Sequence, residues 1–223
     1  MVNIITRNAE KGLISYIIQF LASNKLTSPD ISIDKVSQFQ DALDKTEMAQ
    51  TAVNELKKIP EVNIMFKERW LPAPFNLDEL SQLPEGTLGQ LYADHIKSKG
   101  FKISFYQTVP VVDDISYLNM LWRTTHDFYH IVGGFGTDEI GEVGVQSFLL
   151  AQTPIPISSI MVSFALVRIC LYEPDKTQYL MSEISRGYNL GSQTSAKFIA
   201  QKWDKYWDVQ ISDIRANLGM KTI

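Results

Sequence analysis

Residues 126–142, HDFYHIVGGFGTDEIGE, contain two of the three histidines in this chain of 223 residues. His126 and His130 are four residues apart, so on an α-helix their side chains point in directions that differ by roughly 40°. Asp127 comes three residues before His130 and falls on the same side, within roughly 100° of the helix surface. The spacing predicts a helix that presents two imidazoles and one carboxylate on one face.

Glycines at 133, 134 and 136 end this helix and predict a turn. Residues 137–139, Thr-Asp-Glu, supply a capping side chain and acidic residues that favour the start of a second helix. This returning helix would bring Glu142 toward the imidazoles, and we expect Gly141 and Gly144 to let the two helices approach closely. Imidazole and carboxylate groups that converge from facing helices can form a divalent-metal site.

Two histidines four residues apart are weak evidence alone, because buried histidines are often hydrogen-bonded parts of a core. Asp127 and Glu142 strengthen the metal interpretation, since polar groups clustered inside helices need a compensating partner. Two neutral imidazoles and two carboxylates would balance a 2+ ion and leave a coordination position open. Such mixed ligands admit zinc, iron, manganese, cobalt and, more weakly, magnesium.

The composition is ordinary for a soluble globular protein, with 45% hydrophobic and 21% charged residues. A net charge of −4 without a long basic run argues against nucleic acid as a partner. Cys170 is the single cysteine, which excludes an internal disulfide and a multi-cysteine zinc site and fits a reducing compartment.

Residues 1–12, MVNIITRNAEKG, have neither the apolar run of a signal peptide nor the arginines of a mitochondrial presequence. Residues 155–172 are the most apolar stretch, but they contain Pro156 and Arg168 and are barely long enough to span a bilayer. We therefore expect a buried core helix there. The expected location is the cytoplasm or the cytoplasmic face of a membrane.

Hydrophobic periodicity predicts an all-α, single-domain multi-helix bundle over residues 1–223, with few or no short strands. The expected helices lie near residues 8–23, within 34–58, from 76 or 78 to before 84, over 87–99, from 113 or 114 through the histidines, after 138, over 155–172, from 175 toward 186, and over 194–218. Pro60 is expected to stop the second helical region, and residues 66–74 to form an extended strap, because prolines disfavour helix there.

Several separated motifs, in the same order, resemble the coenzyme Q (ubiquinone) biosynthesis protein family that is fourth in the yeast nomenclature. The segment from His126 to Glu142 fits the pattern H-D-x-x-H-x11-E, and LPEGTLGQLY at 83–92 resembles a second box of that family. Further agreement comes from Tyr117 and Arg123 ahead of the histidines, GEV at 141–143 and TPIP at 153–156. The resemblance is strongest over 64–172. Departures are Thr124, where glutamate is usual, and Gly134-Phe135-Gly136 in the turn.

The resemblance implies a helical protein of quinone biosynthesis that binds a divalent metal, zinc first, through His126, Asp127, His130 and Glu142. It also implies isoprenoid lipid as a ligand, other quinone-biosynthesis enzymes as partners, peripheral contact with a membrane, and the option of a homodimer. Such a protein either catalyses oxidative decarboxylation of a prenylated head group or organises the biosynthetic complex. Catalytic residues are not assigned.

Arg123 lies three residues before His126, near the same helix face, so it can pair with a substrate carboxylate or phosphate, or with a nearby acidic residue. A slot for an isoprenoid tail would be lined by Tyr129, Phe148, Ile160 and Phe164. Ordinary core packing is the alternative for each of these four.

Two other functions remain open. One is a non-catalytic lipid-binding scaffold with a structural metal. The other is a metal-dependent hydrolase, which the His-Asp pair suggests, but which needs an upstream histidine, and His95 is expected at an exposed helix end. For the amphipathic helix over 194–218, we consider membrane contact through Lys202, Trp203, Lys205 and Trp207, with packing on the core as the alternative.

Overall fold

The computed structural model describes residues 40–99, 110–153 and 155–220, and these ranges are helical, with one isolated antiparallel bridge between Thr87 and Gln210. The all-α prediction is confirmed. The expected helix near residues 8–23 lies outside the described residues.

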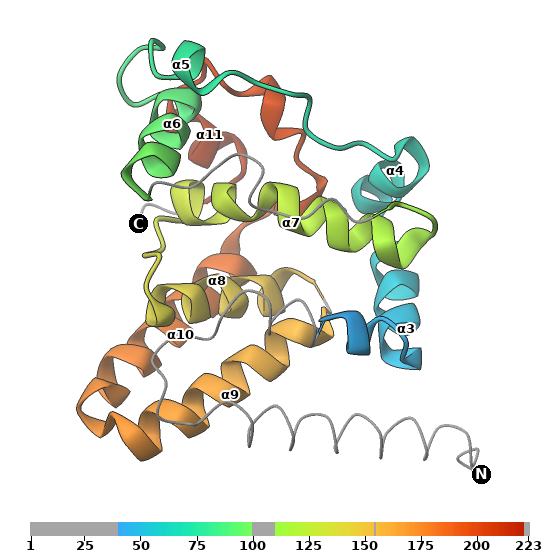
Figure 1. Cartoon of the computed structure of the whole chain (residues 1–223), viewed down its shortest axis with the longest axis vertical. Helices are drawn as coiled ribbons and strands as arrows, with labels where there is room; N and C mark the ends of the chain where they lie inside the picture. Colours follow the sequence, from blue (N-terminus) through green and yellow to red (C-terminus); the bar gives the residue numbers. More distant parts are fainter. Residues whose placement is uncertain (1–39, 100–109, 154, 221–223) are drawn as a thin grey trace.

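The helices follow one another along the chain with short connections. They are α3 Glu47–Leu56, α4 Pro60–Glu68, α5 Leu77–Leu80, α6 Leu88–Lys99, α7 Asp114–Gly133, α8 Glu139–Gln152, α9 Pro156–Tyr172, α10 Thr177–Gln193 and α11 Ile211–Asn217, with 3₁₀ turns η2 Pro174–Lys176, η3 Phe198–Ala200 and η4 Trp203–Lys205. In Figure 1, α7 crosses the middle of the molecule, with α3 and α4 near its start and α6 and α11 near its end, while α8, α9 and α10 lie on one side.

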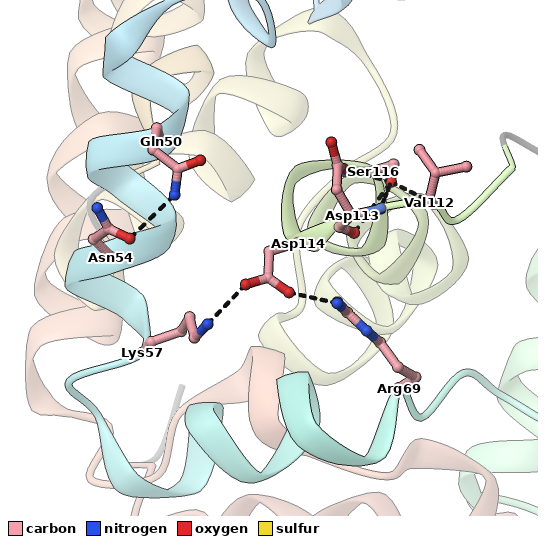
Figure 2. Close-up of polar contacts among 8 residues, drawn as sticks. All are labelled: Gln50, Asn54, Lys57, Arg69, Val112, Asp113, Asp114 and Ser116. Atoms are coloured by element: carbon pink, nitrogen blue, oxygen red, sulfur yellow. Dashed lines mark hydrogen bonds and ion pairs between the residues drawn. The ribbon is translucent and has the colours of Figure 1, made fainter.

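The start of α7 is held by a capping box and by two cations from earlier helices (Figure 2). Asp113 accepts a hydrogen bond from the Ser116 backbone N–H (2.8 Å), and the Ser116 hydroxyl in turn contacts the Asp113 backbone N–H. Asp114 accepts from Lys57 Nζ (2.7 Å) and from Arg69. Because these groups satisfy the free N–H groups and the positive end of the helix dipole, α7 begins where the sequence predicts.

The closest helix packing is between α8 and α10, and glycines make it possible. A Cβ atom on Gly187 of α10 would lie 2.2 Å from the carbonyl oxygen of Gly144, and one on Gly191 would lie 2.5 Å from that of Phe148. A Cβ on Gly141 would instead meet the backbone of Gly136. The expectation that Gly141 and Gly144 bring α8 close to α7 is therefore wrong. A Cβ on Gly144 would meet the Phe135 ring of the turn first (2.8 Å) and Glu183 of α10 next (3.2 Å), and Gly141 lets α8 begin against the glycine turn.

The helical region before Pro60 ends as predicted, since α3 stops at Leu56. Pro60 is also the first residue of α4, where its missing N–H costs nothing because that donor has no helical partner, so a new helix runs as far as Glu68. The extended strap is shorter than predicted and runs from Trp70 to Asn76.

Residues 194–218 do not form the single amphipathic helix that was predicted, but two 3₁₀ turns followed by α11. Two backbone carbonyls of this segment accept hydrogen bonds from another helix. The N–H groups of Leu88 and Gly89, at the start of α6, donate to the carbonyls of Val209 (2.9 Å) and Trp207 (2.8 Å). Trp203 is 0% exposed and stacks on Phe128, with ring centroids 5.3 Å apart. Trp203 packs inward, so membrane contact through a helix carrying this side chain is wrong.

None of the helices in the described ranges is long and apolar enough to cross a membrane. α9 buries one face, which includes Arg168, hydrogen-bonded through Nε to Glu139 of α8 (2.6 Å) and ion-paired with Glu173 (2.8 Å). Its other face leaves Val167 and Leu171 exposed. The helix therefore packs in the fold on one side only.

Candidate metal centre

The centre is formed where α8 returns past the histidine face of α7. The His126 and His130 rings lie edge to face with centroids 4.8 Å apart. Glu142 places Oε2 at 3.2 Å from His126 Nε2 and Oε1 at 3.2 Å from His130 Nε2. One ligand atom from each of the three residues lies within 4.8 Å of the others, so the cluster can hold a metal ion.

The glycine turn sets the direction of α8. Gly134 adopts φ 66° as the C-cap of α7, a left-handed conformation that a residue with a Cβ adopts at a cost. Asp138 caps α8 by accepting a hydrogen bond from the backbone N–H of Gly141 (2.7 Å). This reversal of the chain between two fixed helix ends carries Glu142 back to the imidazoles, as predicted.

Burial and charge oppose each other at this site. Burial disfavours the ionised Glu142 carboxylate, but the imidazoles of His126 and His130 outweigh it and hold the Glu142 pKa well below its usual range. Burial likewise disfavours a charged His126, but Glu142 outweighs it and raises the pKa of that imidazole. The carboxylate is thus ionised at neutral pH and available as a ligand, and the Glu142 side chain, 39% exposed, gives the centre an opening to solvent.

The His130 ring is oriented by the turn that follows α7. Its Nδ1 lies 2.9 Å from the carbonyl oxygen of Gly136. Beside a carbonyl oxygen, Nδ1 acts as the donor, so the lone pair of the neutral ring is on Nε2, which faces Glu142. Backbone carbonyl partners of this kind are typical of histidines that bind metals.

Asp127 lies on the opposite side of His126 from Glu142. Its Oδ1 is 4.0 Å from His126 Nδ1 and 3.6 Å from Nε2 of His95, which comes from α6. The structure therefore brings together three of the four expected ligands, and the fourth, Asp127, lies beside His126 Nδ1 and outside the cluster. His95 is not at an exposed helix end as predicted, because its side chain is 14% exposed and its ring stacks on that of His130 at 6.0 Å.

Arg123 is buried, with 9% of its surface exposed, one helical turn before His126. Across the described ranges its guanidinium makes no ion pair within 4 Å and no hydrogen bond. Burial raises the pKa of Asp44, although hydrogen bonds from Gln40 and Asn119 oppose that rise. The positive charge of Arg123 also lowers this pKa, by a smaller amount. A buried cation without a paired anion is costly, so this guanidinium has unused capacity to bind a negative group.

The residues proposed for an isoprenoid slot lie in different surroundings. Tyr129 and Phe148 are fully buried and in edge contact, with centroids 6.0 Å apart. Phe164 is buried on α9, whereas Ile160 is half-buried. Tyr129 and Phe148 thus have the packing of core side chains.

A cavity of about 30 Å³ is lined in part by Trp122, whose ring centroid lies 5.2 Å from that of His126. Asp44, Asn119 and Ile157 are among the residues that line it. A cavity of this size has room for about one or two water molecules and not for an isoprenoid tail.

The fold and this site define an all-helical protein with a largely buried His-His-Glu cluster that can hold a metal ion. Residues 32–223 match the family model of the coenzyme Q (ubiquinone) biosynthesis protein Coq4. The chain therefore belongs to this family.

Individual relatives agree. The chain is 26% identical over 148 residues to the mitochondrial ubiquinone biosynthesis protein COQ4 of Coprinopsis cinerea, covering 65% of this chain and 50% of that one. It is 30% identical over 155 residues to the mitochondrial coq4 protein of Aspergillus terreus, covering 68% and 50%. The chain thus spans about half the length of these curated relatives.

The fold is also that of a crystal structure from Nostoc punctiforme PCC 73102, of a protein provisionally described as a ubiquinone biosynthesis protein. That chain is 58% identical to this one, with a TM-score of 0.87 over 96% of this chain and 99% of the other.

Proposed function

We propose that this protein binds a divalent metal between α7 and α8 and uses the site to hold the head group of a prenylated quinone precursor. The observation that carries the proposal is the convergence of two imidazole nitrogens on one carboxylate, each at 3.2 Å, in a member of a ubiquinone-biosynthesis family. The proposed ligands are His126, His130 and Glu142, and Asp127, the fourth residue of the motif, supplies a second carboxylate beside them.

The donor set fits zinc first. Two neutral imidazoles and one carboxylate are ligands that zinc takes in catalytic sites with an open position, and the same set admits iron, manganese, cobalt and, more weakly, magnesium. A bound divalent ion would supply a Lewis acid and a binding point for a phenolate or carboxylate oxygen. The exposed edge of Glu142 marks the side from which a head group can approach.

Arg123 is the proposed partner for the negative charge of that head group. It is on the same helix as both histidines, it is buried, and within the described part of the chain it has no anion paired with it. A guanidinium binds a carboxylate or phosphate through two parallel hydrogen bonds, which would orient the ring as well as neutralise it.

Two roles follow for such a site. In the first, the protein catalyses oxidative decarboxylation: the ring carboxyl leaves as carbon dioxide, a hydroxyl from water takes its place, and dioxygen or another oxidant accepts the two electrons and two protons, dioxygen becoming hydrogen peroxide. In the second, the same site holds the lipid head group without turnover, and the protein organises other quinone-biosynthesis enzymes as a scaffold.

The isoprenoid tail would pass toward α9, along Ile160 and Phe164, and repacking of Tyr129 and Phe148 would extend the slot. Apolar side chains exposed on α9 and α10, such as Leu171 and Tyr188, support contact with a membrane surface, with partner enzymes or with a second copy. We propose that the protein acts in the cytoplasm or at the cytoplasmic face of a membrane.

Purified protein loaded with zinc, iron or manganese should be incubated with a carboxylated prenyl-phenol in air and without oxygen, and the products identified by mass spectrometry. Oxygen-dependent loss of carbon dioxide in the wild type but not in Arg123→Met supports the catalytic role. Arginine-dependent and metal-dependent binding without turnover supports the scaffold. Hydrolysis of a phosphate or amide substrate, or the absence of metal and lipid binding, would contradict the proposal.

A further inference from the structure

We infer that His95 of α6 is a positioning residue of the metal centre, which acts through Asp127 on His126. The inference rests on the proposed metal site. It adds a residue from a third helix and gives Asp127 a role as the link between two imidazoles. In this arrangement His95 donates a hydrogen bond to Asp127, and Asp127 accepts another from His126 Nδ1.

The first observation is that neither side chain makes a hydrogen bond within the described residues. His95 Nε2 is fully buried and has no hydrogen-bond partner in this part of the chain. The Asp127 side chain is 13% exposed, and its carboxylate accepts no hydrogen bond from the residues that the structure describes. A largely buried carboxylate and a buried ring nitrogen are both costly without hydrogen-bond partners. A hydrogen bond between His95 and Asp127 would satisfy both groups.

The second observation is the geometry around Asp127. Its Oδ1 lies 3.6 Å from His95 Nε2 and 4.0 Å from His126 Nδ1, so one oxygen faces an imidazole on either side. Both separations are longer than a hydrogen bond, and small side-chain rotations close them. Tyr92, one turn before His95, is near enough for the Asp127 charge to add to the burial that raises the pKa of its phenol.

The physical consequence concerns the His126 tautomer. His126 can offer a lone pair from Nε2 to a metal only if the proton of the neutral ring is on Nδ1. A carboxylate beside Nδ1 stabilises that tautomer and fixes the ring plane, as Gly136 does for His130. His95 holds this carboxylate in place, so its removal lets Asp127 turn away and frees the His126 ring.

The test compares metal affinity in four matched variants, measured by competition with a chelator for Zn²⁺. His95→Phe keeps an aromatic ring to stack on His130 but has no N–H, and His95→Gln restores a donor. Asp127→Asn removes the carboxylate, and the double variant Asp127→Asn with His95→Phe tests whether the two act in series.

Loss of such an outer partner weakens metal binding by roughly 10–100-fold, so we expect about tenfold weaker Zn²⁺ binding by His95→Phe and most of the affinity back in His95→Gln. In the Asp127→Asn background, His95→Phe should have no further effect. The absorption bands of the Co²⁺-loaded protein should change in His95→Phe, because they report ligand geometry, whereas a loss of general packing would appear as a lower free energy of unfolding in the metal-free protein.

Equal Zn²⁺ affinity of His95→Phe and the wild type overturns the inference, as does an undiminished effect of His95→Phe in the Asp127→Asn background. Glu142→Gln distinguishes failure of the proposed metal site from failure of the proposed role of His95. If Glu142→Gln loses Zn²⁺ and His95→Phe does not, the metal site stands and the role of His95 falls. If Glu142→Gln binds Zn²⁺ as tightly as the wild type, the metal site itself falls, and the inference with it.

Discussion

At the scale of single residues, Glu142 has the central place in the candidate site. It lies in the first turn of α8, sixteen positions after His126, and it reaches both imidazoles with separate oxygens. Without a metal, these contacts make an ion pair that satisfies the buried groups, since the Glu142 pKa is lowered and the His126 pKa is raised by their attraction. A divalent ion bound there would take over the positive charge that His126 otherwise supplies.

Glu142→Gln keeps the size of this side chain but removes its charge, so we expect Zn²⁺ affinity to fall by more than about 100-fold, beyond the usual loss from an outer-sphere change. Saturating metal at about 100 times the dissociation constant should raise the free energy of unfolding of the wild type by roughly 2.7 kcal/mol. Urea unfolding with and without Zn²⁺ measures this gain. The variant should show almost none, while Glu61→Gln, an exposed change on α4, should show the full gain. Equal gains in all three would contradict the assignment of Glu142 as a ligand.

At the scale of elements, two sets of contacts position α7 and α8: those at the start of α7 and those between α8 and α10. The capping box at Asp113 and the pairing of Asp114 with Lys57 and Arg69 start α7 in a defined register (Figure 2). Glycines then let α10 approach α8 until backbone meets backbone. Because the ligands come from both helices, an error at either set of contacts would move Glu142 relative to the imidazoles.

Asp113→Ala should lower the free energy of unfolding by about 1 kcal/mol at neutral pH, the common cost of losing an N-cap. Hydrogen bonds from the Ser116 side chain and then its backbone hold the Asp113 pKa below its ordinary value of 3.8. Its ionised form therefore contributes stability fully above pH 3.8, and this part is lost as the pH falls through the lowered pKa. Urea unfolding from pH 7 to pH 2.5 should show wild type and Asp113→Ala converging in acid. Asp113→Asn keeps an acceptor and should lose little at neutral pH.

Gly187→Ala tests the contact between α8 and α10. The new Cβ would lie 2.2 Å from the Gly144 carbonyl oxygen, and backbone cannot move aside as a flexible side chain does. We expect a loss of about 1–3 kcal/mol in the free energy of unfolding, the usual range for overpacking. Thermal unfolding checks it. Ser182→Ala, an exposed change on the same helix, should be nearly neutral, and a similar neutral result for Gly187→Ala would mean that the helices are farther apart.

At the scale of the whole molecule, the C-terminal segment ties together helices that are distant in sequence. It accepts hydrogen bonds from the start of α6, and Arg215 of α11 donates through Nε to the carbonyl of Val132 (2.9 Å) at the end of α7. Phe198 donates its backbone N–H to the Gln152 side chain (2.9 Å) at the end of α8. This segment therefore supports all three helices that surround the candidate site.

Trp203→Ala should lower the free energy of unfolding by about 3–5 kcal/mol, as large-to-small changes of a buried aromatic do. The side chain is fully buried on Phe128, and its indole N–H has no hydrogen-bond partner among the described residues. Trp203→Phe keeps the stacking and removes that unpaired donor, so it should retain most of the stability. Urea unfolding of both variants and of the exposed control Lys205→Ala measures the difference. A mild effect of Trp203→Ala would contradict the buried placement.

Local patterns were sufficient to predict the fold class, the start of α7 at Asp113, the glycine turn, and the meeting of His126, His130 and Glu142. These features depend on helical periodicity, on caps and on the conformational freedom of glycine, all of which act within about a dozen residues. The burial of His95 could also have been predicted from helical periodicity, because it follows Tyr92 by three residues on a helix whose buried face includes Leu88 and Ile96.

Other features depended on partners far along the chain. The segment 194–218 has a helical spacing of apolar residues, but α6 needs carbonyl partners for its first N–H groups, and the segment supplies them. Nothing near Gly144 in the sequence shows that Gly187 will pack against it, and nothing near Asp127 shows that its carboxylate will face an imidazole from α6. Such pairings are decided by which surfaces meet when the helices pack, because hydrogen bonds and close backbone contacts depend on distance in space.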